Sequence, residues 1–197
     1  DMDYIRDGGL AFTKANLTAA LEASLKRLNT DYLDLYQLHW PQRATNFFGK
    51  LNYQYTDEKA TVTLLETLEA LTEQVRAGKI RYIGVSNETP WGVMRYLQLA
   101  EKHELPRIVS IQNPYSLLNR SFEIALAEIS QHEGVELLAY SSLAFGTLSG
   151  KYLNGAKPAG ARNTLFSRFN RYSAPQTQLA IAEYVALAKK HGLDPSQ

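Results

Sequence analysis

The sequence contains no cysteine among its 197 residues. This absence excludes disulfide bonds, thiolate metal ligands and a cysteine nucleophile, and it is typical of the cytoplasm, where we expect this protein. Long apolar runs are lacking too, because none approaches the roughly 20 residues that span a bilayer. The N-terminal stretch is acidic and has no apolar segment of the kind found in a signal peptide. We therefore expect no membrane partner.

An excess of charge of either sign is also lacking. The 21 Lys and Arg residues nearly balance the 20 Asp and Glu residues, which leaves a net charge of +1. A chain with this balance has no strong attraction to nucleic acid, so we expect a small molecule as its partner. We expect no metal site, because His39 has no second ligand at a suitable spacing and the other three histidines lie near the C-terminal ends of expected helices.

The apolar pattern predicts helices that alternate with strands in a single domain. Expected helices cover residues 16–28, 61–77, 90–105, 121–134 and 177–192, and expected strands cover residues 32–39, 80–87, 107–115 and 135–143. Asn16 is the expected N-cap of the first helix. The strands are short and apolar on both faces, which is typical of a parallel sheet buried on both sides. Either a (β/α)8 barrel or an open doubly wound sheet fits this α/β pattern.

Every expected strand ends in side chains that can form hydrogen bonds or stack. These residues include His39-Trp40-Pro41, Ser86-Asn87, Gln112-Asn113 and Tyr140-Ser141-Ser142. In both parallel architectures, ligands bind beyond the carboxyl ends of the strands. A turn or a helix cap explains Asn87 alone equally well, but the same ending on four strands favours a small-molecule site. His39 then serves as a proton partner or hydrogen-bond donor rather than as a core residue.

The stretch "LAFGTLSGKY" brings two glycines next to a lysine. It matches neither the dinucleotide fingerprint nor a Walker loop, because Tyr152 stands where the latter needs a hydroxyl residue after the lysine. Gly146 and Gly150 would still let the backbone approach a phosphate group that Lys151 neutralises. Three arginines follow it closely in the sequence. A solvated surface loop is the alternative interpretation.

Four blocks of the sequence resemble, in order, consecutive blocks of the aldo-keto reductases. They are "SLKRLNTDYLDLYQLHWP", "GKIRYIGVSN", "IQNPYSLLNR" and "LLAYSSLAFGTLSGKY", and they cover most of residues 16–155. The stretches "FFGKLNY" and "NGAKPAGARNTLFSRF" are similar to the Tas branch of the bacterial members. The resemblance implies a (β/α)8 TIM barrel that binds NADPH without a Rossmann motif and reduces aldehyde or ketone carbonyls.

The resemblance also implies a role for individual residues. His39 would orient the substrate carbonyl, and Trp40 would form a wall of the substrate pocket. Tyr140 would stack on the nicotinamide ring, and Arg168 would meet the 2′-phosphate of NADPH. The remaining residues expected to bind the cofactor are Ser86, Asn87, Gln112, Ser141, Ser142, Leu143, Gly146, Gly150 and Lys151.

The sequence departs from the family pattern at its start. The Asp, Tyr and Lys of the family's catalytic tetrad precede the histidine strand, and no matching block stands here; Lys14 is expected on the surface near a helix cap. We expect the chain to be the middle of a barrel, from the third to the seventh helix, and to be inactive by itself. A nucleotide-sensing subunit similar to potassium-channel β subunits is an alternative function, although "LHWP" is similar to the enzyme branch.

An aromatic-rich loop follows the histidine strand, from Gln42 to Lys59. We expect Pro41 to end the strand so that this loop can cover the opening of the site. Its four aromatic residues, Phe47, Phe48, Tyr53 and Tyr55, suggest an aromatic or apolar carbonyl substrate. Packing of the same side chains in the core is the alternative.

Overall fold

The computed structural model describes residues 10–48 and 52–197, so residues 49–51 of the predicted aromatic loop lie outside it. The chain divides into two compact units. The first unit runs to Asn113 and includes Ala125–Leu138, and the second unit comprises Pro114–Ile124 and Ala139–Gln197. The single domain expected from the chain length stays a prediction.

Four strands form one sheet whose spatial order follows the chain. They are β1 (Leu33–Leu38), β2 (Ile80–Ser86), β3 (Ile108–Pro114) and β4 (Glu136–Tyr140), in the order β1-β2-β3-β4. β2 pairs in parallel with both β1 and β3. A doubly wound sheet reverses its strand order at a switch point, whereas a barrel places consecutive strands side by side. The described strands therefore have the order of a partial (β/α)8 barrel, as the resemblance implied.

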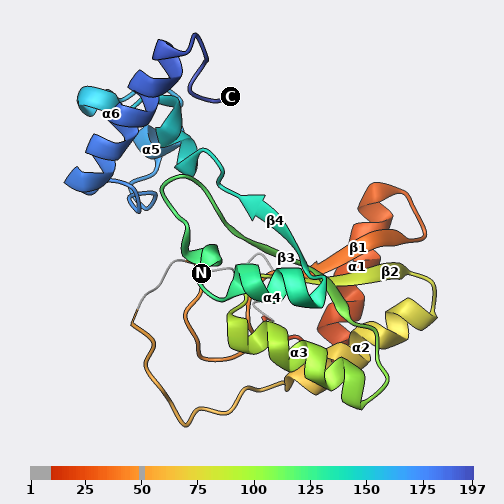
Figure 1. Ribbon diagram of the computed structural model, residues 1–197. Helices are drawn as coiled ribbons and strands as arrows, with labels where there is room; N and C mark the ends of the chain where they lie inside the picture. The colour runs from red at the N-terminus through yellow and green to blue at the C-terminus, as the bar shows by residue number, and fades with distance from the viewer. Residues whose placement is uncertain (1–9, 49–51) are drawn as a thin grey trace. The chain divides into compact units, whose positions relative to one another are not determined.

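Four helices of the first unit follow one another in the same sequence as the strands (Figure 1). They are α1 (Lys14–Leu28), α2 (Leu64–Arg76), α3 (Pro90–Lys102) and α4 (Leu126–Glu133), and each packs against the next. Their apolar faces meet the sheet in a core of fully buried side chains that includes Leu21, Leu68, Ile83, Val93 and Ile111. Consecutive helix contacts of this kind are the helical counterpart of the strand order.

The start of α1 differs from the sequence prediction. Thr13 is the N-cap, because its hydroxyl accepts a hydrogen bond from the backbone N–H of Asn16 at 3.2 Å. The predicted cap, Asn16, instead lies inside the helix, and its side-chain amide donates to the carbonyl of Ala11. Lys14 is the first helical residue and forms an exposed ion pair with Glu73. Lys14 is therefore a surface residue beside the cap, as expected.

Two further expectations about local structure are wrong. The helix expected at residues 121–134 is divided into a 3-10 turn, Ser121–Glu123, and α4, because Ala125 has a positive φ of 67°. Burial of every strand on both faces does not hold either. Leu38 is the single buried residue of β1 and β4 has none, which reflects their position as the outer strands of the described sheet.

The second unit folds around the long helix α6 (Pro175–Lys190). The segment between β4 and α6, which includes the stretch "LAFGTLSGKY", contains short helical turns, which are η3 (Ala144–Ser149), η4 (Leu153–Gly155) and α5 (Arg162–Leu165). Its core consists of Ala144, Leu148, Tyr172, Ile181 and Val185. The loop is therefore a folded segment packed on α6, and the alternative of a merely solvated surface loop is wrong for its buried residues.

Candidate functional site

His39 lies one residue beyond the carboxyl end of β1 and is exposed. Its ring contacts the indole of Trp40, with ring centroids 5.1 Å apart, and meets the ring of Phe48 edge-on at 5.9 Å. Phe48 belongs to the aromatic loop, so this loop reaches the histidine. Among the described residues, His39 is therefore not part of the buried core.

Asn87 joins the ends of the first three strands. Its side-chain Nδ2 donates to the backbone carbonyl of His39 at 2.8 Å and to Ser86 Oγ at 3.0 Å. Its backbone N–H donates to the carbonyl of Gln112 at 3.0 Å, and Ser86 Oγ–H donates to the same carbonyl at 2.8 Å. The structure thus brings His39, Ser86, Asn87 and Gln112 together at one edge of the sheet.

The left-handed backbone at Asn87, with φ of 55°, explains part of this arrangement. Asparagine tolerates this conformation better than most residues, so the turn favours asparagine for a structural reason as well. The structure therefore supports the structural interpretation of Asn87, and its role in ligand binding stays a prediction. The amide of Gln112 is directed toward Gln37, with 3.4 Å between Gln112 Nε2 and Gln37 Oε1.

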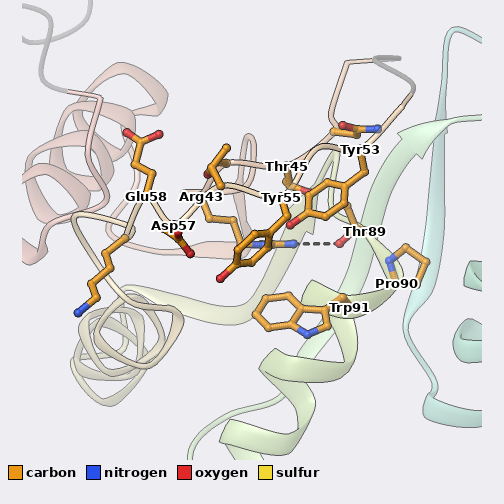
Figure 2. Close-up of a pocket in the computed structure, with 13 residues that line it drawn as sticks. Arg43, Thr45, Tyr53, Tyr55, Asp57, Glu58, Thr89, Pro90 and Trp91 are labelled. Atoms are coloured by element: carbon orange, nitrogen blue, oxygen red, sulfur yellow. Dashed lines mark hydrogen bonds between the residues drawn. The ribbon is translucent and has the colours of Figure 1, made fainter.

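A buried ion pair supports the segment that follows Asn87. Arg43 donates two parallel hydrogen bonds to the carboxylate of Glu88, from Nη1 at 2.9 Å and from Nη2 at 2.6 Å. Arg43 Nη2 also donates to Thr89 Oγ1 at 2.9 Å, as the dashed line in Figure 2 marks. Asn113 Nδ2 donates to the backbone carbonyl of Glu88 at 3.0 Å.

Sequence reasoning missed this support altogether. Arg43 stands in a polar loop and Glu88 follows a strand 45 residues later, so no local spacing connects them.

Glu88 also acts on Tyr96, a buried tyrosine of α3. Burial raises the pKa of the Tyr96 hydroxyl, and the negative charge of Glu88 raises it further.

The predicted residues of the second unit surround the turns at residues 141–151. Ser141, Gly146 and Gly150 have positive φ values of 55°, 86° and 80°. A Cβ atom on Gly146 would lie 3.0 Å from Lys151 Nζ, so the lysine side chain crosses directly over this glycine. Burial raises the pKa of the Tyr140 hydroxyl, while the nearby guanidinium of Arg171 acts in the opposite direction.

The second unit has a marked excess of positive charge that the sequence analysis did not single out. Residues 137–182 contain five basic residues and no carboxylate, and the basic residues are Lys151, Lys157, Arg162, Arg168 and Arg171. The guanidinium of Arg168 lies 5.7 Å from the ring centroid of Phe166 and 5.0 Å from that of Phe169. This charge and the aromatic platform suit the phosphates and the base of a dinucleotide.

Two cavities contain predicted site residues. His39 and Trp40 line a cavity of about 240 Å³ together with Phe12. Ser142 and Leu143 line a cavity of about 490 Å³ in the second unit. Within the described part of the chain, no group of three or more His, Cys, Asp or Glu side chains is placed to hold a metal ion. No helix among the described residues is long and apolar enough to cross a bilayer.

The sequence of this chain is similar to those of several known proteins. The sequence model described as the Aldo/keto reductase family matches residues 4–197. "Protein tas" of Escherichia coli (strain K12) is 73% identical over 187 residues, which cover 95% of this chain and 54% of that protein. An aldo-keto reductase of Babesia bovis is 36% identical, over 96% of this chain and 71% of its own length. The chain spans about half the length of the tas proteins that it matches.

Proposed function

This chain belongs to the aldo/keto reductase family, and on that premise we propose that its protein reduces aldehyde or ketone carbonyls with NADPH. The resemblance to the Tas branch is confirmed as well, by the identity of 73% to the tas protein of Escherichia coli. We also propose location in the cytoplasm and a small carbonyl compound as the substrate. Neither nucleic acid nor a membrane is proposed as a partner.

The observation that carries the proposal is the hydrogen-bonded edge at the ends of β1, β2 and β3. There His39, Ser86, Asn87 and Gln112 converge, and hydroxyl and amide groups of this kind are suited to hold a nicotinamide carboxamide. In the second unit, taken by itself, the positive charge of residues 137–182 is suited to phosphate groups. The donor set of the chain therefore fits NADPH.

When bound, NADPH would supply a hydride to the carbonyl carbon, and the electron pair of the C=O π bond would pass to the oxygen, which would take up a proton from solvent. We assign the orientation of this oxygen to His39, whose exposed ring can donate a hydrogen bond to it. Trp40 and Phe48 flank the histidine and would exclude water from an apolar substrate. Positioning of both reactants in this way is a large part of such catalysis.

Thermal unfolding of the full-length protein with and without NADPH tests this proposal. At a hundred times its dissociation constant, NADPH should raise the free energy of unfolding by about 2.7 kcal/mol. The Gln112→Ala variant should need a higher NADPH concentration for the same shift. A melting temperature that saturating NADPH does not change would contradict the proposal. A shift without carbonyl-dependent oxidation would favour the nucleotide-sensing subunit instead.

A further inference from the structure

A cavity of about 1000 Å³ lies in the first unit, between the aromatic loop and the start of α3 (Figure 2). The residues that line it include Arg43, Tyr53, Tyr55, Asp57 and Trp91. Neither His39 nor any residue assigned to NADPH lines it. Its volume is at the upper end of the range of about 300–1,000 Å³ that is usual for small-molecule sites. The cavity is therefore large enough for a ligand of its own.

The floor of this cavity is rigid and electrically neutral. The guanidinium of Arg43 lies 4.8 Å from the centroid of the Trp91 indole, and the Glu88 carboxylate holds it there. The Glu88 side chain is only 3% exposed, and that of Arg43 is 16% exposed. A buried ion pair contributes little net stability, so its effect here is to fix geometry. Arg43 thus offers the cavity a fixed cation whose charge is already balanced.

The rest of the lining combines exposed aromatic rings with an excess of negative charge. Trp91 is 61% exposed, and Tyr53 and Tyr55 are 59% and 78% exposed. The other charged residues of the lining are Asp57, Glu58 and Lys59, so its two carboxylates outnumber its one ammonium group. The faces of electron-rich rings attract cations, and the net negative charge acts in the same direction. An anionic ligand would meet no unbalanced positive group except Lys59.

We propose that this cavity binds an organic cation, in which an amine or quaternary ammonium group is attached to an apolar body. The charged group lies against the rings of Trp91 and Tyr55, and Asp57 and Glu58 contribute the long-range attraction. One face of the Trp91 indole lies against the guanidinium of Arg43, so a cationic ligand would use the exposed remainder of the ring. This site is independent of NADPH and of the carbonyl chemistry.

The test is a titration of the full-length, 15N-labelled protein with choline and with its neutral carbon isostere, 3,3-dimethylbutan-1-ol. The indole N–H signal of Trp91, identified by its loss in Trp91→Phe, reports binding by its chemical shift. Choline should bind about 2- to 30-fold more tightly than the isostere. The Asp57→Asn/Glu58→Gln variant should lower the affinity for choline but not the affinity for the isostere. Lys59→Gln should raise the affinity for choline.

A second measurement follows the ligand signals, so that Trp91→Ala can be compared with the unmodified protein. This substitution should abolish the preference for choline while the protein stays folded by circular dichroism, because the side chain is largely exposed and only its contact with Arg43 is lost. Equal affinity for choline and the isostere would overturn the proposal. The absence of any shift, or an unchanged preference in Trp91→Ala, would overturn it as well. None of these readouts depends on NADPH, so the carbonyl reductase proposal stands or falls separately.

Discussion

Replacing Arg43 by methionine removes one member of the buried ion pair next to Asn87. The variant keeps the length and much of the apolar stem of the side chain but loses both hydrogen bonds to Glu88. The Glu88 carboxylate then keeps its hydrogen bonds from the backbone N–H and hydroxyl of Thr89. It remains buried without its counter-charge, which is the costly arrangement.

The size of the effect follows from the burial of the two partners. Removing one partner from a fully buried pair lowers stability by about 3–5 kcal/mol. Arg43 retains 16% side-chain exposure, so we expect the lower end, a loss of about 3 kcal/mol. Arg43→Lys keeps the charge but not the two parallel hydrogen bonds, and should lose about 1–2 kcal/mol. Arg43→Met/Glu88→Leu should recover most of the loss, because no buried charge remains.

Urea unfolding of the full-length variants, followed by circular dichroism, measures these differences as shifts in the midpoint at constant slope. Arg43→Met should also speed chymotrypsin cleavage at Tyr53 or Tyr55, because Arg43 connects the aromatic loop to the start of α3. A loss below about 1 kcal/mol would refute the reasoning. So would a double variant that is less stable than Arg43→Met, because the cost would then not arise from the unpaired carboxylate.

Three further predictions concern single sites. Gly92→Ala should destabilise the protein in a urea titration although alanine favours helix, because its Cβ would lie 2.2 Å from Glu88 Oε1 and 2.6 Å from Arg43 Nη2; in an Arg43→Ala/Glu88→Ala background the penalty should be smaller. The raised pKa of Tyr96 means that the unfolded state loses its proton first, so stability should fall above pH 10; Tyr96→Phe should reduce the slope by at most about 1.4 kcal/mol per pH unit. Thr63→Ala should lower the free energy of unfolding by about 1 kcal/mol, and Thr63→Ser should not. Hydrogen bonds from Thr63 lower the pKa of the Glu66 carboxyl group. The stability difference between Thr63→Ala and the unmodified protein should therefore shrink as acid protonates Glu66.

The edge that carries the candidate site could be predicted because its signals are local. The apolar run of β1 stops at Leu38, so His39 is placed at the strand end by its position alone. The same holds for Asn87, which follows the last residue of β2. In a parallel sheet the carboxyl ends lie at one edge, so residues distant in the sequence are brought together by topology.

The remaining features depend on tertiary contacts or on close competition between neighbours. Thr13 and Asn16 are both good caps, and the structure uses threonine while asparagine bonds to the preceding turn. Ala125 breaks a helix with a positive φ, although alanine is the strongest helix former. The pairing of Arg43 with Glu88 forms only when the loop is folded, and no sequence pattern predicts it.

The rate of carbonyl-dependent NADPH oxidation in His39→Ala tests the central claim most directly. The full-length protein is assayed with an aromatic aldehyde, alongside His103→Ala, a matched control at the exposed end of α3. The account predicts that His39→Ala lowers kcat by about 100-fold or more while the Kd for NADPH stays within about twofold. His103→Ala should leave both unchanged. An unchanged kcat in His39→Ala would contradict the account.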